Sequence, residues 1–126
     1  MSRTFAAIAA LTFIFASTAA SAQMLKTADT PKGKTFVDAK GMTLYTFDKD
    51  AGGKSTCNGP CAENWPPLAV AADAKPTADM TIVVRDDGKK MWAYKGKPLY
   101  TFKQDTAPGE TKGDGFLNGA WHMAKP

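Results

Sequence analysis

Two cysteines, one histidine and a pair of repeated aspartates are the side chains of this sequence best suited to chemistry. Cys57 and Cys61 enclose only residues 58–60, an Asn-Gly-Pro turn that can bring two thiols together. A structural disulfide, a soft-metal site of the copper type and a thiol-redox centre all use such a pair. Together with His122 and Met123 the thiols could offer a metal nitrogen and sulfur ligands. We expect the disulfide and keep the metal and redox uses as alternatives.

Asp50 and Asp105 each end a short Tyr-x-Phe-x-x-Asp motif. Asp48 and Asp50, followed by two glycines, resemble a calcium loop only faintly, and Lys103 stands at the place of Asp48 in the second motif. We therefore expect Asp50 and Asp105 to cap turns by accepting backbone N–H groups. The sequence has no nucleophile elbow, no zinc-type histidine pair and no phosphate-binding glycine loop, so we expect no catalytic residue, no enzyme activity and no cofactor.

A repeat with an offset of 55 residues connects the two motifs. Residues 40–50 and 95–105 are identical at seven of eleven positions, and Trp65 and Trp121 match at an offset of 56. Ordinary composition would match about one position in fifteen, so two copies of one structural unit are expected. The shared positions, which we expect to be structural with ligand binding as the alternative, are Gly41, Leu44, Tyr45, Phe47, Asp50 and Trp65 in the first copy and Gly96, Leu99, Tyr100, Phe102, Asp105 and Trp121 in the second. The places of Cys57 and Cys61 fall near Gly113 and Leu117, where no thiol occurs.

β-Branched and aromatic runs between glycine turns predict that each copy is an antiparallel meander. Residues 60–64 alone favour a helical turn after residue 22, and the two prolines that follow Trp65 would stop it. The sequence thus predicts an all-β fold, a small antiparallel domain of two tandem β-meander repeats packed around aromatic side chains. The expected repeats span about residues 24–68 and 79–124.

Residues 1–22 have the features of a cleaved secretory signal peptide. Arg3 supplies a positive start, an apolar stretch follows, and Ala20-Ser21-Ala22 is a small-residue cleavage signal. Cleavage would leave residues 23–126 as one domain and lower the formal net charge from +4 to +3, since Arg3 is the charge removed. The lysines are scattered and not clustered, so we expect no nucleic-acid partner. We also expect no transmembrane segment after residue 22 and no lipid-attachment cysteine. The predicted location is periplasmic or secreted.

The combined pattern resembles a family of secreted repeats of unknown function, whose members are predicted bacterial lipoproteins and secreted proteins. The resemblance rests on the Leu-Tyr-x-Phe-x-x-Asp motifs at 44–50 and 99–105, the pair Cys57 and Cys61, and the two matching tryptophans. It implies a location and a repeat pattern but no reaction. We therefore expect an exported, non-enzymatic envelope or periplasmic module that binds or contacts an envelope component. The alternative is a periplasmic copper-type metal or thiol-redox protein that uses the cysteine pair.

Overall fold

The computed structural model describes residues 25–126, so the predicted signal peptide lies outside the described residues. Strands in small antiparallel sheets dominate this part of the chain, which confirms the all-β class. The helical turn expected at residues 60–64 is present, and a second one follows residue 115. The elements are β1 (Lys26–Thr30), β2 (Gly33–Val37), β3 (Tyr45–Phe47), α1 (Pro60–Asn64), β4 (Met80–Val84), β5 (Lys90–Tyr94), β6 (Lys97–Pro98), α2 (Phe116–Gly119) and β7 (Trp121–Met123).

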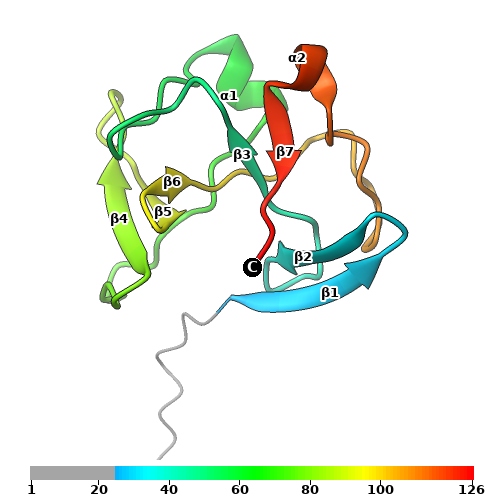
Figure 1. Ribbon diagram of the computed structural model, residues 1–126. Coiled ribbons are helices and arrows are strands. Elements are labelled where there is room, and N and C mark those ends of the chain that lie inside the picture. The colour runs from blue at the N-terminus through cyan, green and yellow to red at the C-terminus, as the bar shows by residue number, and fades with distance from the viewer. Residues whose placement is uncertain (1–24) are drawn as a thin grey trace, which may run out of the picture.

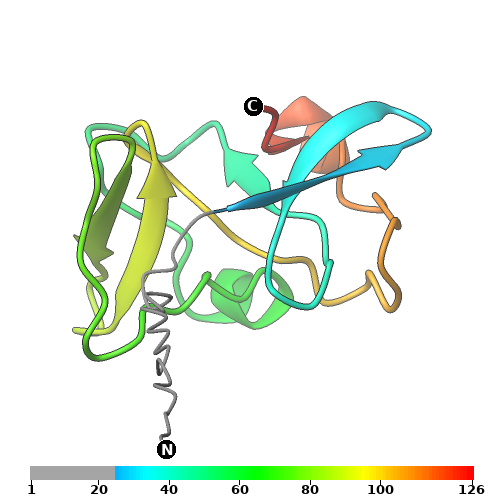
Figure 2. The same ribbon diagram turned by 90° about the horizontal axis from the view of Figure 1, so that it is seen from below.

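Two hairpins lie on opposite sides of the molecule, with β3 and β7 between them (Figures 1 and 2). β1 pairs with β2 in one hairpin, and β4 pairs with β5 in the other, where the short β6 adds a third strand. The motif glycines Gly41 and Gly96 follow the hairpins with φ angles of 83° and 85°. Only glycine adopts this left-handed conformation without a steric cost, which accounts for its presence in both copies.

The third strand of each repeat pairs with a segment of the other repeat. β3 runs antiparallel to β7, with Tyr45 opposite Met123 and Phe47 opposite Trp121. Residues 100–102 run in the same way against residues 65–67, through a bridge between Pro67 and Tyr100. The compact units of the fold therefore differ from the sequence repeats. One unit, here the first lobe, consists of residues 26–47 and 121–125, and the second lobe consists of residues 65–102.

The two lobes meet at Tyr45 and Tyr100. The Tyr45 N–H donates to the Tyr100 carbonyl at 2.8 Å, and the Tyr100 N–H donates to the Tyr45 carbonyl at 3.0 Å. Each lobe is closed by an equivalent set of backbone bonds: Leu44 donates to Phe36 at 3.0 Å in the first, and Leu99 donates to Trp92 at 2.9 Å in the second. This reciprocity is that of an approximate two-fold axis, which passes between the two tyrosines.

A stack of four aromatic rings forms the centre of the core. Phe47 stacks on Trp121 at 4.2 Å between ring centroids, Trp121 on Trp65 at 3.7 Å, and Trp65 on Phe102 at 4.0 Å. The rings therefore alternate between the first and the second repeat. Trp65 is 4% exposed and Trp121 is 1% exposed. The stack therefore holds the two repeats together by burying apolar surface and by attraction between the rings.

Candidate functional site

The motif tyrosine of each repeat donates a hydrogen bond to the motif aspartate of the other repeat. The Tyr45 hydroxyl donates to Asp105 Oδ2 at 2.5 Å, and the Tyr100 hydroxyl donates to Asp50 Oδ2 at 2.6 Å. The second carboxylate oxygen of each aspartate accepts a backbone N–H, from Thr56 at 2.7 Å or from Lys112 at 2.9 Å. The aspartates thus hold the two loops in place, as the sequence predicted, and they also join the repeats.

Three of the four side chains in these pairs are buried, and Asp50 is partly exposed. Burial, together with the bond to the aspartate, raises the pKa of the Tyr45 phenol and of the Tyr100 phenol well above the ordinary tyrosine value. Both tyrosines are fully buried, and Asp105 is only 6% exposed. Phenols with a raised pKa stay protonated at neutral pH, so both tyrosines keep the proton that they donate to the aspartates.

A disulfide joins Cys57 to Cys61 in the loop between Asp50 and Trp65, as predicted. The Cys57 side chain is buried and Cys61 packs against the aromatic core at the start of α1. Both sulfur atoms are therefore bonded to each other, and a thiolate for a metal or for redox exchange would form only after reduction.

Beside the disulfide, a directed chain of hydrogen bonds ends at Asp50. Arg85 is 5% exposed and donates to Ser55 Oγ at 2.8 Å and to the Cys57 carbonyl at 2.9 Å. Ser55 in turn lies 2.7 Å from the Tyr100 hydroxyl. Because Tyr100 donates to the carboxylate of Asp50, Ser55 is the donor to Tyr100. The buried guanidinium is thereby supplied with acceptors, which removes most of the cost of its burial.

In the corresponding loop of the second repeat, the tyrosine hydroxyl accepts its hydrogen bond from a backbone N–H instead of a serine side chain. The Gly113 N–H donates to the Tyr45 hydroxyl at 3.2 Å. A Cβ on Gly113 would lie 2.7 Å from the Trp65 ring, so only glycine fits there. α2 follows, where Leu117 and Asn118 have left-handed φ angles of 61° and 59°. Phe116 and Leu117 are exposed at 43% and 54%, although Phe116 still contacts the Trp65 ring edge-on at 5.7 Å.

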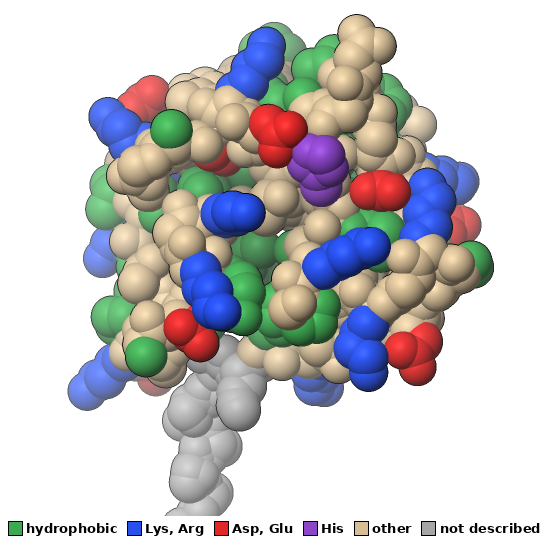
Figure 3. Space-filling model, in the orientation of Figure 1, with side chains coloured by type: hydrophobic (Ala, Val, Ile, Leu, Met, Phe, Trp, Pro, Cys, Tyr) green, Lys and Arg blue, Asp and Glu red, His purple; other side chains and the backbone are tan. Residues whose placement is uncertain are grey.

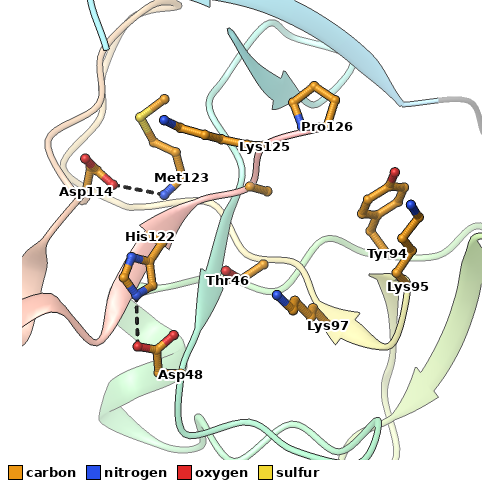
Figure 4. A pocket seen from close by; sticks show the side chains of 11 residues that line it. Thr46, Asp48, Tyr94, Lys95, Lys97, Asp114, His122, Met123, Lys125 and Pro126 are labelled. Atoms are coloured by element: carbon orange, nitrogen blue, oxygen red, sulfur yellow. Dashed lines mark hydrogen bonds and ion pairs between the residues drawn. The ribbon is translucent and has the colours of Figure 1, made fainter. Parts of the chain in front are cut away.

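An open hollow of about 690 Å³ lies beside β7, on the face shown in Figure 3, where lysines surround it and the histidine lies between acidic side chains. It is bounded by β3 and β7, by the last residues of the chain and by the turn between β5 and β6 (Figure 4). Tyr94, Met123 and Ala124 give it an apolar part. Its ionisable side chains are Asp48, Lys95, Lys97, Asp114, His122 and Lys125.

The acidic side chains of this hollow are already engaged. His122 Nε2 lies 2.8 Å from Asp48 Oδ2, and Asp114 accepts the Met123 N–H at 3.1 Å and faces Lys32 Nζ at 3.4 Å. In contrast, no carboxylate of residues 25–126 forms an ion pair with Lys95, Lys97 or Lys125. The hollow therefore carries ammonium groups whose charge the surrounding protein leaves without a direct counter-charge.

Three side chains of the hollow, Lys97, His122 and Lys125, have no charged counterpart in the other repeat, whereas Lys95 corresponds to Lys40. At the equivalent positions of the other repeat, His122 is replaced by Pro66, Lys125 by Ala69 and Lys97 by Met42. The fold is the same on both sides, so it does not require these side chains. Residues that a repeated fold does not need are candidates for a function of their own.

The sequence-predicted metal ligands are not brought together. His122 pairs with Asp48 at the rim of the hollow, whereas the cysteines form the disulfide in another loop. In the described part of the chain, no three histidine, cysteine or acidic side chains are arranged to hold a metal ion. Over the same residues, no helix has the length and apolar character needed to cross a membrane.

The sequence did not predict the hollow, although it drew attention to three of its residues, Asp48, His122 and Met123, for other reasons. Lys95, Lys97 and Lys125 are isolated in the sequence and read as ordinary surface lysines. A usable signal was present, however. Lys97 and Lys125 are positions where the two repeats differ in charge, and a position-by-position comparison of the copies would have identified them.

Fold and site together define a small all-β protein made of two interlocked repeats, with its motif residues buried and a charged hollow on one side. The chain belongs to the family described as a secreted repeat of unknown function, which matches it twice, at residues 26–69 and 81–125. That description supports an exported location. Among curated proteins and among solved structures, none matches the chain.

Proposed function

We propose that this protein is an exported, non-enzymatic binding module of the cell envelope, located in the periplasm or secreted from the cell. The observation that carries the proposal is the hollow beside β7. Its volume of about 690 Å³ lies within the range of roughly 300 to 1,000 Å³ that ligand sites occupy. Lys97 comes from β6, and His122 and Lys125 come from β7 and the residues after it; none of the three has a charged counterpart in the other repeat.

The non-enzymatic character is supported by how the reactive side chains are used. The tyrosine and aspartate of each motif are bonded to each other inside the core, and the cysteines are joined in a disulfide. The one close pair of ionisable groups in the hollow, His122 and Asp48, is about half exposed on both sides. A solvent-exposed pair of this kind is poorly suited to proton transfer, because water screens it and neither group is desolvated.

Sedimentation of the labelled protein with washed envelope fractions tests the proposal. We expect saturable binding that is weakened at least tenfold by Lys97→Glu together with Lys125→Glu, since two charge reversals in one site oppose any ligand that the lysines attract. Lys54→Glu with Lys75→Glu is the matched control, because it changes the net charge equally at exposed positions outside the hollow. Equal binding of the two double variants would show that the hollow is not the binding site.

A further inference from the structure

We infer that the ligand of this hollow is a compact molecule that carries two or more anionic groups, phosphate or carboxylate, on an uncharged body. The inference rests on the proposed function and adds the chemical class of the ligand. Lys95 and Lys97 flank the β5–β6 turn on one side of the hollow, and Lys125 approaches from the end of the chain (Figure 4). Ammonium groups on two sides favour a ligand with more than one negative group.

The state of the lysines supports an anion. Lys125 Nζ makes only a 3.4 Å bond to the Lys32 carbonyl, and Lys95 Nζ lies over the Tyr94 ring, 5.3 Å from its centroid. Neither contact neutralises a charge, and Lys97 has no ion-pair partner among the described residues. An incoming phosphate or carboxylate would therefore gain charged hydrogen bonds without first breaking an ion pair.

The acidic side of the hollow does not oppose this. The Asp114 carboxylate is held by the Met123 N–H and by Lys32, and Asp48 is turned toward His122. Both carboxylates lie away from the turn that carries Lys95 and Lys97, with Asp48 beside His122 and Asp114 beside Met123 (Figure 4). The anionic groups of the ligand are thus directed to the lysine side of the hollow.

An uncharged body is indicated by the surfaces between the lysines. Met123 and Ala124 are buried at 4% and 5% exposure and close one part of the lining. The Tyr94 ring is fixed there by an edge contact with Phe36, at 4.7 Å between centroids and 61° between planes. The partly exposed Tyr94 ring, fixed in this way, offers contact to carbon atoms at little loss of conformational entropy, whereas the buried Met123 and Ala124 contribute little accessible surface.

Amide NMR spectra of the isotope-labelled protein, titrated with pyrophosphate and in parallel with citrate in metal-free buffer, test the inference. We expect shift changes to concentrate on residues 94–97 and 122–125. Lys97→Gln with Lys125→Gln should raise Kd about 4- to 25-fold, which corresponds to about 2- to 5-fold for each exposed charge pair lost. The control Lys54→Gln with Lys75→Gln should change Kd by less than about twofold. The tighter of the two probes identifies phosphate or carboxylate as the preferred group.

Shift changes spread over all surface lysines, or an equal loss in the control variant, would overturn the inference, as would the absence of binding by both probes. This experiment and the sedimentation experiment can fail independently of each other. Envelope binding that depends on Lys97 and Lys125 but is not displaced by either anion would overturn the ligand class and leave the binding module intact. Binding of the anions at the hollow without envelope binding would overturn the proposed function alone.

Discussion

The loops of residues 48–64 and 103–120 perform one task with different means. Each loop contains an aspartate that accepts a hydrogen bond from the tyrosine of the other repeat, and each leads into a tryptophan of the central stack. The first loop is held by a disulfide and by the buried Arg85. The second uses a backbone N–H from Gly113 and left-handed turns. The paired side chains are thus what the fold requires, whereas the way in which each loop is closed varies freely.

The same contrast holds at the surface. His122, Lys125 and Lys97 line the hollow. The equivalent positions in the other repeat are Pro66, Ala69 and Met42. A duplicated fold therefore separates two kinds of residue within one chain. The Tyr–Asp pairs and the stacked rings occur in both repeats and maintain the structure, whereas Lys97, His122 and Lys125 occur in one repeat and are not needed for the fold.

Replacing the shared tyrosines gives the largest expected effect and tests whether the two halves are equivalent. Tyr45→Ala and Tyr100→Ala should each lower the free energy of unfolding by about 3 to 5 kcal/mol, because each removes a fully buried ring and leaves an aspartate without its donor. Urea denaturation measures both. The half-buried Tyr94→Ala is the control and should cost clearly less. A small effect at only one motif tyrosine would break the equivalence of the halves.

Removing the disulfide should have an intermediate effect that is confined to the first loop. The bond closes a loop of five residues, Cys57 to Cys61, for which chain entropy predicts a stabilisation of about 2 kcal/mol. Cys57→Ala with Cys61→Ala should lower the free energy of unfolding by that amount and make Tm insensitive to reductant. If reduction leaves the Tm of the wild-type protein unchanged, the disulfide adds no stability. The first loop would then resemble the second loop, which is held without a disulfide.

Alkaline pH gives the smallest expected effect and sharpens the comparison of the two tyrosines. The pKa values of Tyr45 and Tyr100 are raised in the folded protein, whereas an unfolded tyrosine has a pKa of about 10. Above that pH only the unfolded state loses the protons, so stability falls as pH rises, by up to about 1.4 kcal/mol per pH unit for each tyrosine. Tyr45→Phe and Tyr100→Phe should each make this decline less steep.

Urea denaturation at a series of pH values between about 10 and 11 measures the slope. Urea denaturation at neutral pH serves as the control that shows each phenylalanine variant to be folded. A slope that is unchanged in either variant would mean that its phenol titrates normally, and would contradict the buried Tyr–Asp pair at that site.

Local sequence signals predicted the parts of the fold that depend on local chemistry. Pro60 at the first position of α1 and the prolines after Trp65 defined that turn, and the glycine turns and aromatic runs predicted the hairpins. The cross-repeat pairing could not be predicted in this way. A repeat shows that Tyr45 and Tyr100 have similar surroundings, but the same pattern results whether each tyrosine meets its own aspartate or that of the other copy.

The hollow and α2 were unpredictable for different reasons. Lys97 and Lys125 become neighbours of one cavity only because β7 crosses to the first lobe and β6 belongs to the second. At α2, Leu117 and Asn118 adopt left-handed angles that leucine in particular disfavours, and no propensity rule would assign them. Long-range topology decides the hollow, whereas α2 depends on backbone angles that run against local preference.

The position of β7 after the second lobe in the chain affects how folding can proceed. The second lobe is continuous, from residue 65 to residue 102, and its strands can pair as soon as they are adjacent. The first lobe instead waits for Trp121–Met123, more than seventy residues after the strand that they cover. Closing so long a loop slows folding, and until it closes the edge of β3 and one face of the Phe47 ring stay open. The core is therefore complete only when residues 121–123, which follow the whole second lobe, have paired with β3.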